Sequence, residues 1–71
     1  MTPQEWLDKA MYEGGIFAGF EYGLHASDLD DSNQTFKSLV RAAESLADDY
    51  ANAEQRLLEY AEEAGYETEE S

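Results

Sequence analysis

The hydrophobic positions in the second half of the chain recur at alternating intervals of three and four residues. This spacing places one apolar side chain per turn on a single face of an α-helix. The positions are Phe36, Leu39, Ala43, Leu46, Tyr50, Ala53, Leu57, Tyr60 and Ala64. Val40, Ala47 and Ala61 widen this face. The pattern predicts one helix over residues 32–64, about 50 Å long at 1.5 Å per residue.

The ends of this predicted helix carry suitable capping residues. Asp31, with Gln34 three residues later, has the spacing of a capping box. Gly65 is suited to end the helix, with Tyr66 making the apolar contact of a Schellman motif. Residues 67–71, which are mostly acidic, are expected to fray.

The first residues also carry a helix start. Thr2-Pro3-Gln4-Glu5 combines a capping residue, a first-turn proline and a glutamate at the third helical position. One broad apolar face follows at 100° per residue, formed by Trp6, Leu7, Ala10, Met11, Phe17 and Ala18. A first helix over about residues 3–25 is predicted, followed by an acidic loop over about 26–31.

The segment GGIFAGFEYGLH within this helix is open to two interpretations. Read as a strand, it alternates apolar residues from Ile16 to Leu24, but the chain offers no second strand to pair with it. Read as a helix, it carries a stripe of glycines four residues apart, which costs about 1 kcal/mol per glycine relative to alanine. Close approach of the alanine-rich flank at Ala42, Ala43 and Ala47 is the expected compensation. We favour the helix, with a kink or break near Gly14-Gly15 left open.

The expected packing follows from how apolar this segment is. A helix that is apolar almost all round has to be surrounded by other elements, which one partner helix cannot do. Either a break at Gly14-Gly15 gives a compact three-helix monomer, or two hairpins pair into a four-helix bundle. We expect a single all-α domain over residues 1–66 that dimerises. The residues expected to mediate helix packing or self-association are Gly15, Gly19, Gly23, Phe17 and Phe20.

Composition changes this picture chiefly through charge. The chain has 71 residues, no cysteine, and 17 acidic against 4 basic residues, for a net charge of −13. Such a charge argues against nucleic acid or an anionic membrane as a direct partner, since lysine and arginine drive that binding. It favours a basic partner protein, a halophilic cytoplasm or a solubilised surface. Without a secretion signal or a transmembrane stretch, the sequence predicts a cytoplasmic protein.

Candidate catalytic and metal-binding chemistry is weak. The residues around Asp28 and Asp30 loosely resemble a calcium loop, but Asn33 stands where the sharp turn needs glycine. His25 is the single histidine and lacks an accompanying nucleophile or metal-ligand set. Neither predicted helix carries the Glu-x-x-His pairs of a di-iron bundle. We expect no enzymatic activity, no metal and no cofactor.

The acidic residues of the second predicted helix are the stronger functional candidates. They lie off its apolar face, some as like-charge pairs four residues apart, and three crowd the helix C-terminus, where the dipole disfavours anions. These candidates for partner binding are Glu44, Asp48, Asp49, Glu59, Glu62 and Glu63. The loop acids Asp28, Asp30 and Asp31 are added to them, although acid at this place also favours the start of a helix.

In size, acidity, absence of cysteine and helical acidic faces, the chain resembles small phage-encoded anti-defence proteins. These are the anti-CRISPR and anti-restriction proteins, several of which mimic DNA. The resemblance implies inhibition of a nucleic-acid-binding enzyme, plausibly a nuclease, by occlusion or mimicry within the host-cell cytoplasm. The alternatives are a homo-oligomeric structural or assembly module whose acid only confers solubility, and a halophile's protein of any role.

Overall fold

The computed structural model describes residues 1–45 and 49–68, and every regular element in these two ranges is helical. This confirms the prediction of an all-α chain. In chain order the elements are α1 (Pro3–Glu13), α2 (Ile16–Glu21), the 3₁₀ helix η1 (Ala26–Asp28), α3 (Gln34–Ser45) and α4 (Tyr50–Glu63).

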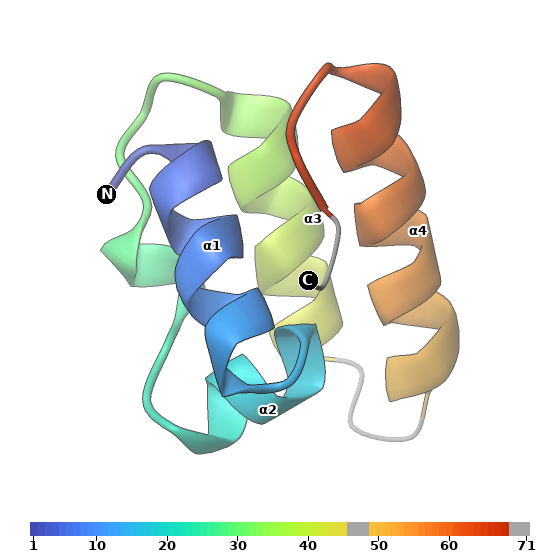
Figure 1. Ribbon diagram of the computed structural model, residues 1–71. Coiled ribbons are helices and arrows are strands. Elements are labelled where there is room, and N and C mark those ends of the chain that lie inside the picture. Colours follow the sequence, from blue (N-terminus) through green and yellow to red (C-terminus); the bar gives the residue numbers. More distant parts are fainter. Residues whose placement is uncertain (46–48, 69–71) are drawn as a thin grey trace.

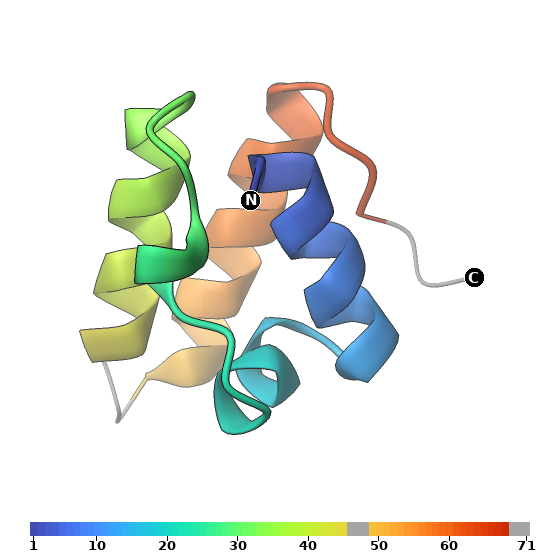
Figure 2. The ribbon, with the colours of Figure 1, turned by 90° about the vertical axis from the view of Figure 1, so that its left-hand side faces the viewer.

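The helices enclose one core. Figures 1 and 2 show α3 and α4 side by side and running in opposite directions, with α1 packed across them. The short helix α2 lies at the end of the molecule where α1 and α3 finish and α4 begins. The opposite end carries the start of α1, the loop before α3 and the C-terminal turn of α4.

The prediction of one continuous helix over residues 32–64 is wrong. The structure has two shorter helices, α3 and α4, and its longest dimension is 28 Å, against about 50 Å for the predicted helix. The heptad pattern did not reveal this break because both helices keep the same apolar spacing and pack those faces into one core. Phe36, Val40 and Ala43 are buried from α3, and Leu57 and Ala61 from α4. Leu46 and Ala47 lie outside the described residues.

The break at Gly14-Gly15, which the sequence left open, is present. Both glycines have positive φ, 118° and 133°, a conformation that other residues rarely adopt. Gly14 ends α1 in the left-handed conformation, and its N–H donates to carbonyls of the last turn. The chain then reverses, so that α2 packs on α1. The region predicted as one helix over residues 3–25 therefore forms two helices, and the second of them ends at Glu21.

The predicted glycine stripe is therefore also wrong, because Gly15, Gly19 and Gly23 do not share one helix. Only Gly19 marks a close approach, and its neighbours are Ala10 of α1 and Leu24 rather than the alanines of α3. Gly23 has φ 96° and open space around it. Ile16, Gly19 and Leu24 are buried within one chain, which removes the packing reason for a dimer.

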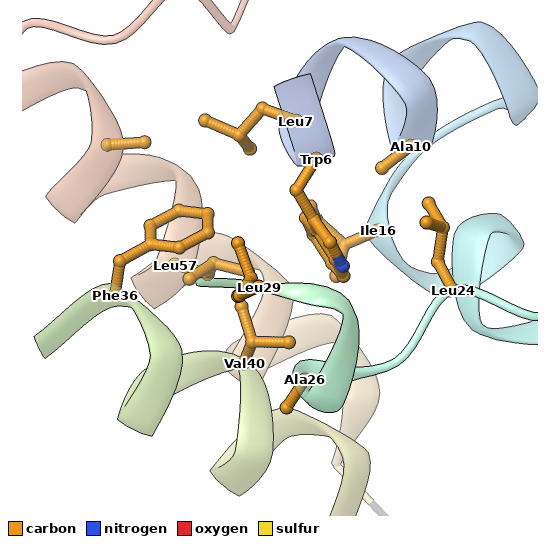
Figure 3. Close-up of a cluster of buried hydrophobic side chains, with 11 residues drawn as sticks. Trp6, Leu7, Ala10, Ile16, Leu24, Ala26, Leu29, Phe36, Val40 and Leu57 are labelled. Atoms are coloured by element: carbon orange, nitrogen blue, oxygen red, sulfur yellow. The ribbon is translucent and has the colours of Figure 1, made fainter. Parts of the chain in front are cut away.

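Trp6 occupies the centre of the core. Its ring is fully buried and lies 6.0 Å from the rings of Phe20 and Phe36, in a tilted and a T-shaped arrangement. The indole N–H donates to the carbonyl of His25 at 3.1 Å, which satisfies its one polar group. Figure 3 shows Val40 and Leu57 from the other two long helices close to this ring. Trp6 thus ties α1 to α3 and to the segment after α2.

Two of the three predicted caps are confirmed. Thr2 and Glu5 form the capping box at the start of α1, and the backbone N–H and hydroxyl of Thr2 lower the pKa of Glu5. After α4, the N–H of Gly65 donates to Glu62 and that of Tyr66 to Ala61, as a Schellman motif requires.

The predicted cap at Asp31 is wrong, because Asn33 performs this role. The Oδ1 atom of Asn33 accepts from the backbone N–H of Phe36 at 3.0 Å and from the hydroxyl of Tyr60 at 3.3 Å. Its Nδ2 atom donates to the hydroxyl of Tyr66 at 2.9 Å. One amide side chain therefore caps α3 and joins it to α4 and to the segment after it.

Gly19→Ala tests the close packing of α2 on α1. A helix with room for a methyl group gains about 1 kcal/mol from this change. Here the new Cβ atom would lie 3.3 Å from Ala10 Cβ and 3.0 Å from Leu24 Cδ1, so we expect a loss of about 1–3 kcal/mol in urea unfolding. Ser38→Ala, on the exposed face of α3, is the control and should leave stability nearly unchanged. A more stable G19A protein would contradict the packing.

Substitution of Asn33 separates its cap from its link to Tyr66. Asn33→Ala should lower the free energy of unfolding by about 1–2 kcal/mol through loss of the cap, with a further loss from the tyrosine bonds. Asn33→Asp keeps the acceptor for Phe36 and loses only the Nδ2 donor. Its melting temperature should therefore lie between those of the natural chain and of Asn33→Ala. Equal melting temperatures for all three proteins would show that Asn33 is not a structural residue.

Candidate functional site: the acidic surface

The three loop acids proposed for partner binding each have a partner within the chain. Asp28 accepts from the backbone N–H of His25 at 2.9 Å, which closes the 3₁₀ turn η1. Asp30 accepts from the hydroxyl and the N–H of Ser32, and these two bonds lower its pKa. Asp31 pairs with Lys37 at 3.1 Å. All three carboxylates therefore shape the loop that leads into α3.

Glu44 has an internal role that the sequence did not predict. It lies in the last turn of α3, and its Oε1 atom accepts from the backbone N–H of Ala26 at 2.7 Å. The same oxygen lies 3.4 Å from Nδ1 of His25. The carboxylate thus caps the start of η1, where the unpaired N–H groups of a helical turn favour an anion. Its place near the end of α3, unfavourable for α3 alone, is explained by this contact.

Glu54 makes a similar contact from α4, and the sequence analysis did not single it out. Its Oε2 atom accepts from the backbone N–H of Phe17 at 2.9 Å, at the first turn of α2. Gly15, the N-cap of α2, has no side chain to make this bond, and a Cβ atom there would lie 3.4 Å from the same carboxylate oxygen. Glu54 therefore supplies from α4 the cap that the local sequence lacks.

The two aspartates predicted to continue the acidic face need a different account. Asp48 lies outside the described residues. Asp49 is the N-cap residue of α4, and its side chain accepts from Asn52 at 2.8 Å. Acid at a helix start is favoured by the dipole, so the charge of Asp49 has a structural explanation within the chain.

Glu59, Glu62 and Glu63 remain as the sequence described them. All three are exposed on the last two turns of α4, where the helix dipole disfavours negative charge. Glu59 accepts a long bond of 3.4 Å from Gln55, and Glu62 one of 3.5 Å from Thr68. Among the described residues none of the three is within ion-pair distance of a basic side chain. We call these residues the α4 acidic end.

The acidic surface is continued only in part by the chain after α4. The backbone of Glu67 exchanges two hydrogen bonds with the side chain of Gln4, so the expected fraying does not begin at this residue. Residues 69–71 lie outside the described part of the chain.

The aromatic residues of α1 and α2 divide between the core and the surface. Trp6 is fully buried, and Phe20, expected to mediate helix packing or self-association, packs against the core of its own chain. Phe17 is partly exposed, and the most exposed large side chains are Tyr12 at 87% and Tyr22 at 72%. The exposure of Tyr12 could have been found from its position outside the apolar face of α1.

Within residues 1–45 and 49–68, no group of three or more histidine and carboxylate side chains is placed to hold a metal ion. None of the helices described there combines the length and the apolar character needed to cross a bilayer.

The comparisons with known proteins give no relative. No family model matches the chain, and no curated protein and no solved structure matches it. Function is therefore inferred from the chain's own charge and geometry.

Alanine substitutions should divide the acids into two classes. Glu44→Ala and Glu54→Ala each remove a cap made across the fold and should lower the free energy of unfolding by about 0.5–2 kcal/mol. Glu59→Ala and Glu63→Ala, matched in chemistry, should leave the melting temperature unchanged or raise it, because they relieve repulsion at the helix end. Equal losses from all four substitutions would contradict the division.

Proposed function

We propose that the protein is an acidic inhibitor that binds a basic nucleic-acid-handling protein through the α4 acidic end. The inhibitor would occupy the cationic surface that the partner uses for DNA or RNA. The partner is expected to be a nuclease or a nucleic-acid-binding complex in the cytoplasm of the host cell. Neither catalysis nor a cofactor is part of this proposal.

One observation supports the proposal above the others. Glu59, Glu62 and Glu63 lie exposed at the helix end where they reduce helix stability, and in the described structure no basic side chain pairs with them. Acids with an internal role, such as Glu44 and Glu54, have a donor within the chain instead. Charge kept at a structural cost is best explained by attraction to an external cation.

The size of the molecule determines which form of mimicry it can use. A rod of about 50 Å is absent, and α4 is only about 21 Å long at 1.5 Å per residue. The carboxylates on its last two turns are fixed on a body with no dimension above 28 Å. Such a body suits occlusion of a local phosphate-binding patch rather than imitation of an extended strand.

The resemblance in size and acidity to phage anti-CRISPR and anti-restriction proteins supports the same proposal. In those of them that mimic DNA, the inhibitor supplies the anion and the target supplies lysine and arginine, and we propose the same arrangement here. Under this proposal the net charge of −13 steers the encounter, and the affinity falls as salt screens it.

Self-association into a homodimeric assembly module is the second candidate. It is favoured by the exposure of Tyr12 and Tyr22, which are large side chains left uncovered by one chain. The charge of −13 on each copy opposes it. Sedimentation at low and high salt distinguishes the two candidates. Salt weakens the repulsion between copies and therefore favours a homodimer, whereas it weakens the attraction to a basic partner and therefore dissociates that complex.

Affinity capture from a cell lysate tests the inhibitor proposal. The natural chain should capture basic nucleic-acid-binding proteins at low salt and release them at high salt. The variant E59Q/E62Q/E63Q should lose this capture, because the charges that bind the partner are gone. The control D8N removes an exposed charge of α1 and should keep it.

A captured protein must then release labelled DNA or RNA when the natural chain is added. Equal capture by the triple glutamine variant and by its control would contradict the α4 acidic end as the binding surface. Captured proteins that retain their nucleic acid would contradict inhibition by occlusion.

A further inference from the structure

Exposed large hydrophobic side chains are concentrated at one end of the molecule. Of the four in the described chain, Tyr12, Phe17 and Tyr22 belong to the last turn of α1 and to α2 with its C-cap. Figures 1 and 2 both place this region at the end opposite the C-terminal turn of α4. We call Tyr12, Phe17 and Tyr22 the aromatic end. It is a separate surface from the α4 acidic end.

The chain at the aromatic end carries more acidic than basic residues. Glu13 follows Tyr12 and Glu21 precedes Tyr22, while Lys9, one turn before Tyr12 in α1, is followed by no further lysine or arginine until Lys37. Glu21 is exposed and Glu13 partly so, and within the described residues neither is in an ion pair. A tyrosine ring attracts a cation to its face, and a carboxylate beside it binds a guanidinium through paired hydrogen bonds. This combination selects a cationic partner.

Arginine fits this surface better than lysine does. A guanidinium is planar, stacks on an aromatic face and is weakly hydrated, whereas an ammonium is compact and strongly hydrated. Tyrosine is also among the residues that contribute most at protein interfaces. A second copy of the chain would bring Glu13 and Glu21 against the same acids, and nucleic acid or an anionic membrane would be repelled likewise.

We propose that the aromatic end docks arginine side chains of a basic protein, which stack on Tyr12 and Tyr22 while Glu13 and Glu21 neutralise them. This inference rests on the proposed function in taking the partner to be basic. It adds a second contact surface and a preference for arginine. The α4 acidic end, by contrast, has no aromatic ring among its residues, so a preference for arginine there would come from its carboxylates alone.

Two peptides test the preference directly, an arginine homopeptide and a lysine homopeptide of equal length, each followed by fluorescence anisotropy at low salt. The natural chain should bind the arginine peptide more tightly, by roughly two- to five-fold for each ring that is engaged. Y12A/Y22A should lose the part of this preference that ring stacking supplies, while still binding both peptides through charge. Y12F/Y22F keeps the ring faces and should keep the preference.

Two further variants separate the surfaces. E13Q/E21Q should weaken binding of the arginine peptide more than that of the lysine peptide, whereas E59Q/E62Q/E63Q should weaken both and leave the effect of Y12A/Y22A on the arginine preference unchanged. Because Tyr12 and Tyr22 are exposed, the melting curve of Y12A/Y22A followed by circular dichroism should match that of the natural chain.

Each remaining outcome is decisive. Equal affinity of the natural chain for both peptides, or an arginine preference that is undiminished in Y12A/Y22A, overturns this inference and leaves the α4 acidic end untouched. Failure of both peptides to bind at low salt overturns the proposed function and this inference together. Sedimentation that shows a dimer of the natural chain, lost in Y12A/Y22A, assigns the aromatic end to self-association instead.

Discussion

The hydrogen bond from the backbone N–H of Phe17 to the carboxylate of Glu54 is the interaction on which the arrangement of the first half depends. A break at Gly14-Gly15 exposes the unpaired N–H groups of a new helix start, and glycine has no side chain to cap them. Glu54 supplies the cap from α4 at 2.9 Å. Glu44 does the same from α3 for Ala26. Two carboxylates of the second half therefore hold the segment between α1 and α3, in addition to the local bond of Asp28 to His25.

This requirement changes how the chain's acidity should be understood. A net charge of −13 suggests at first a uniformly functional or uniformly solubilising surface. The structure divides it instead, since Glu44, Glu54 and the loop aspartates satisfy donors of their own chain. Glu59, Glu62 and Glu63 gather at the C-terminal end of α4 with only weak contacts. This division supports the inhibitor proposal, because the proposed binding surface then consists of three placed carboxylates rather than of the total charge.

Sequence reasoning recovered the features set by local rules. The capping box of Thr2 and Glu5, the Schellman motif at Gly65 and the apolar positions of α3 and α4 each follow from residues close together in the chain. What it missed depends on contacts across the fold. The heptad spacing continues across residues 46–48, so the pattern alone cannot tell one long helix from two that fold back. The roles of Glu44 and Glu54 likewise depend on which backbone N–H groups the packing brings beside them.

Amide hydrogen exchange at Phe17 and Ala26, followed by NMR, tests most directly whether acids of the second half hold the first half in place. The account predicts that both amide protons exchange slowly, at rates like those of amides inside the long helices, although each lies at the start of a short element. Exchange as fast as that of unbonded loop amides would show that neither carboxylate is bound there. The division of the acids into internal caps and a free surface would then be wrong.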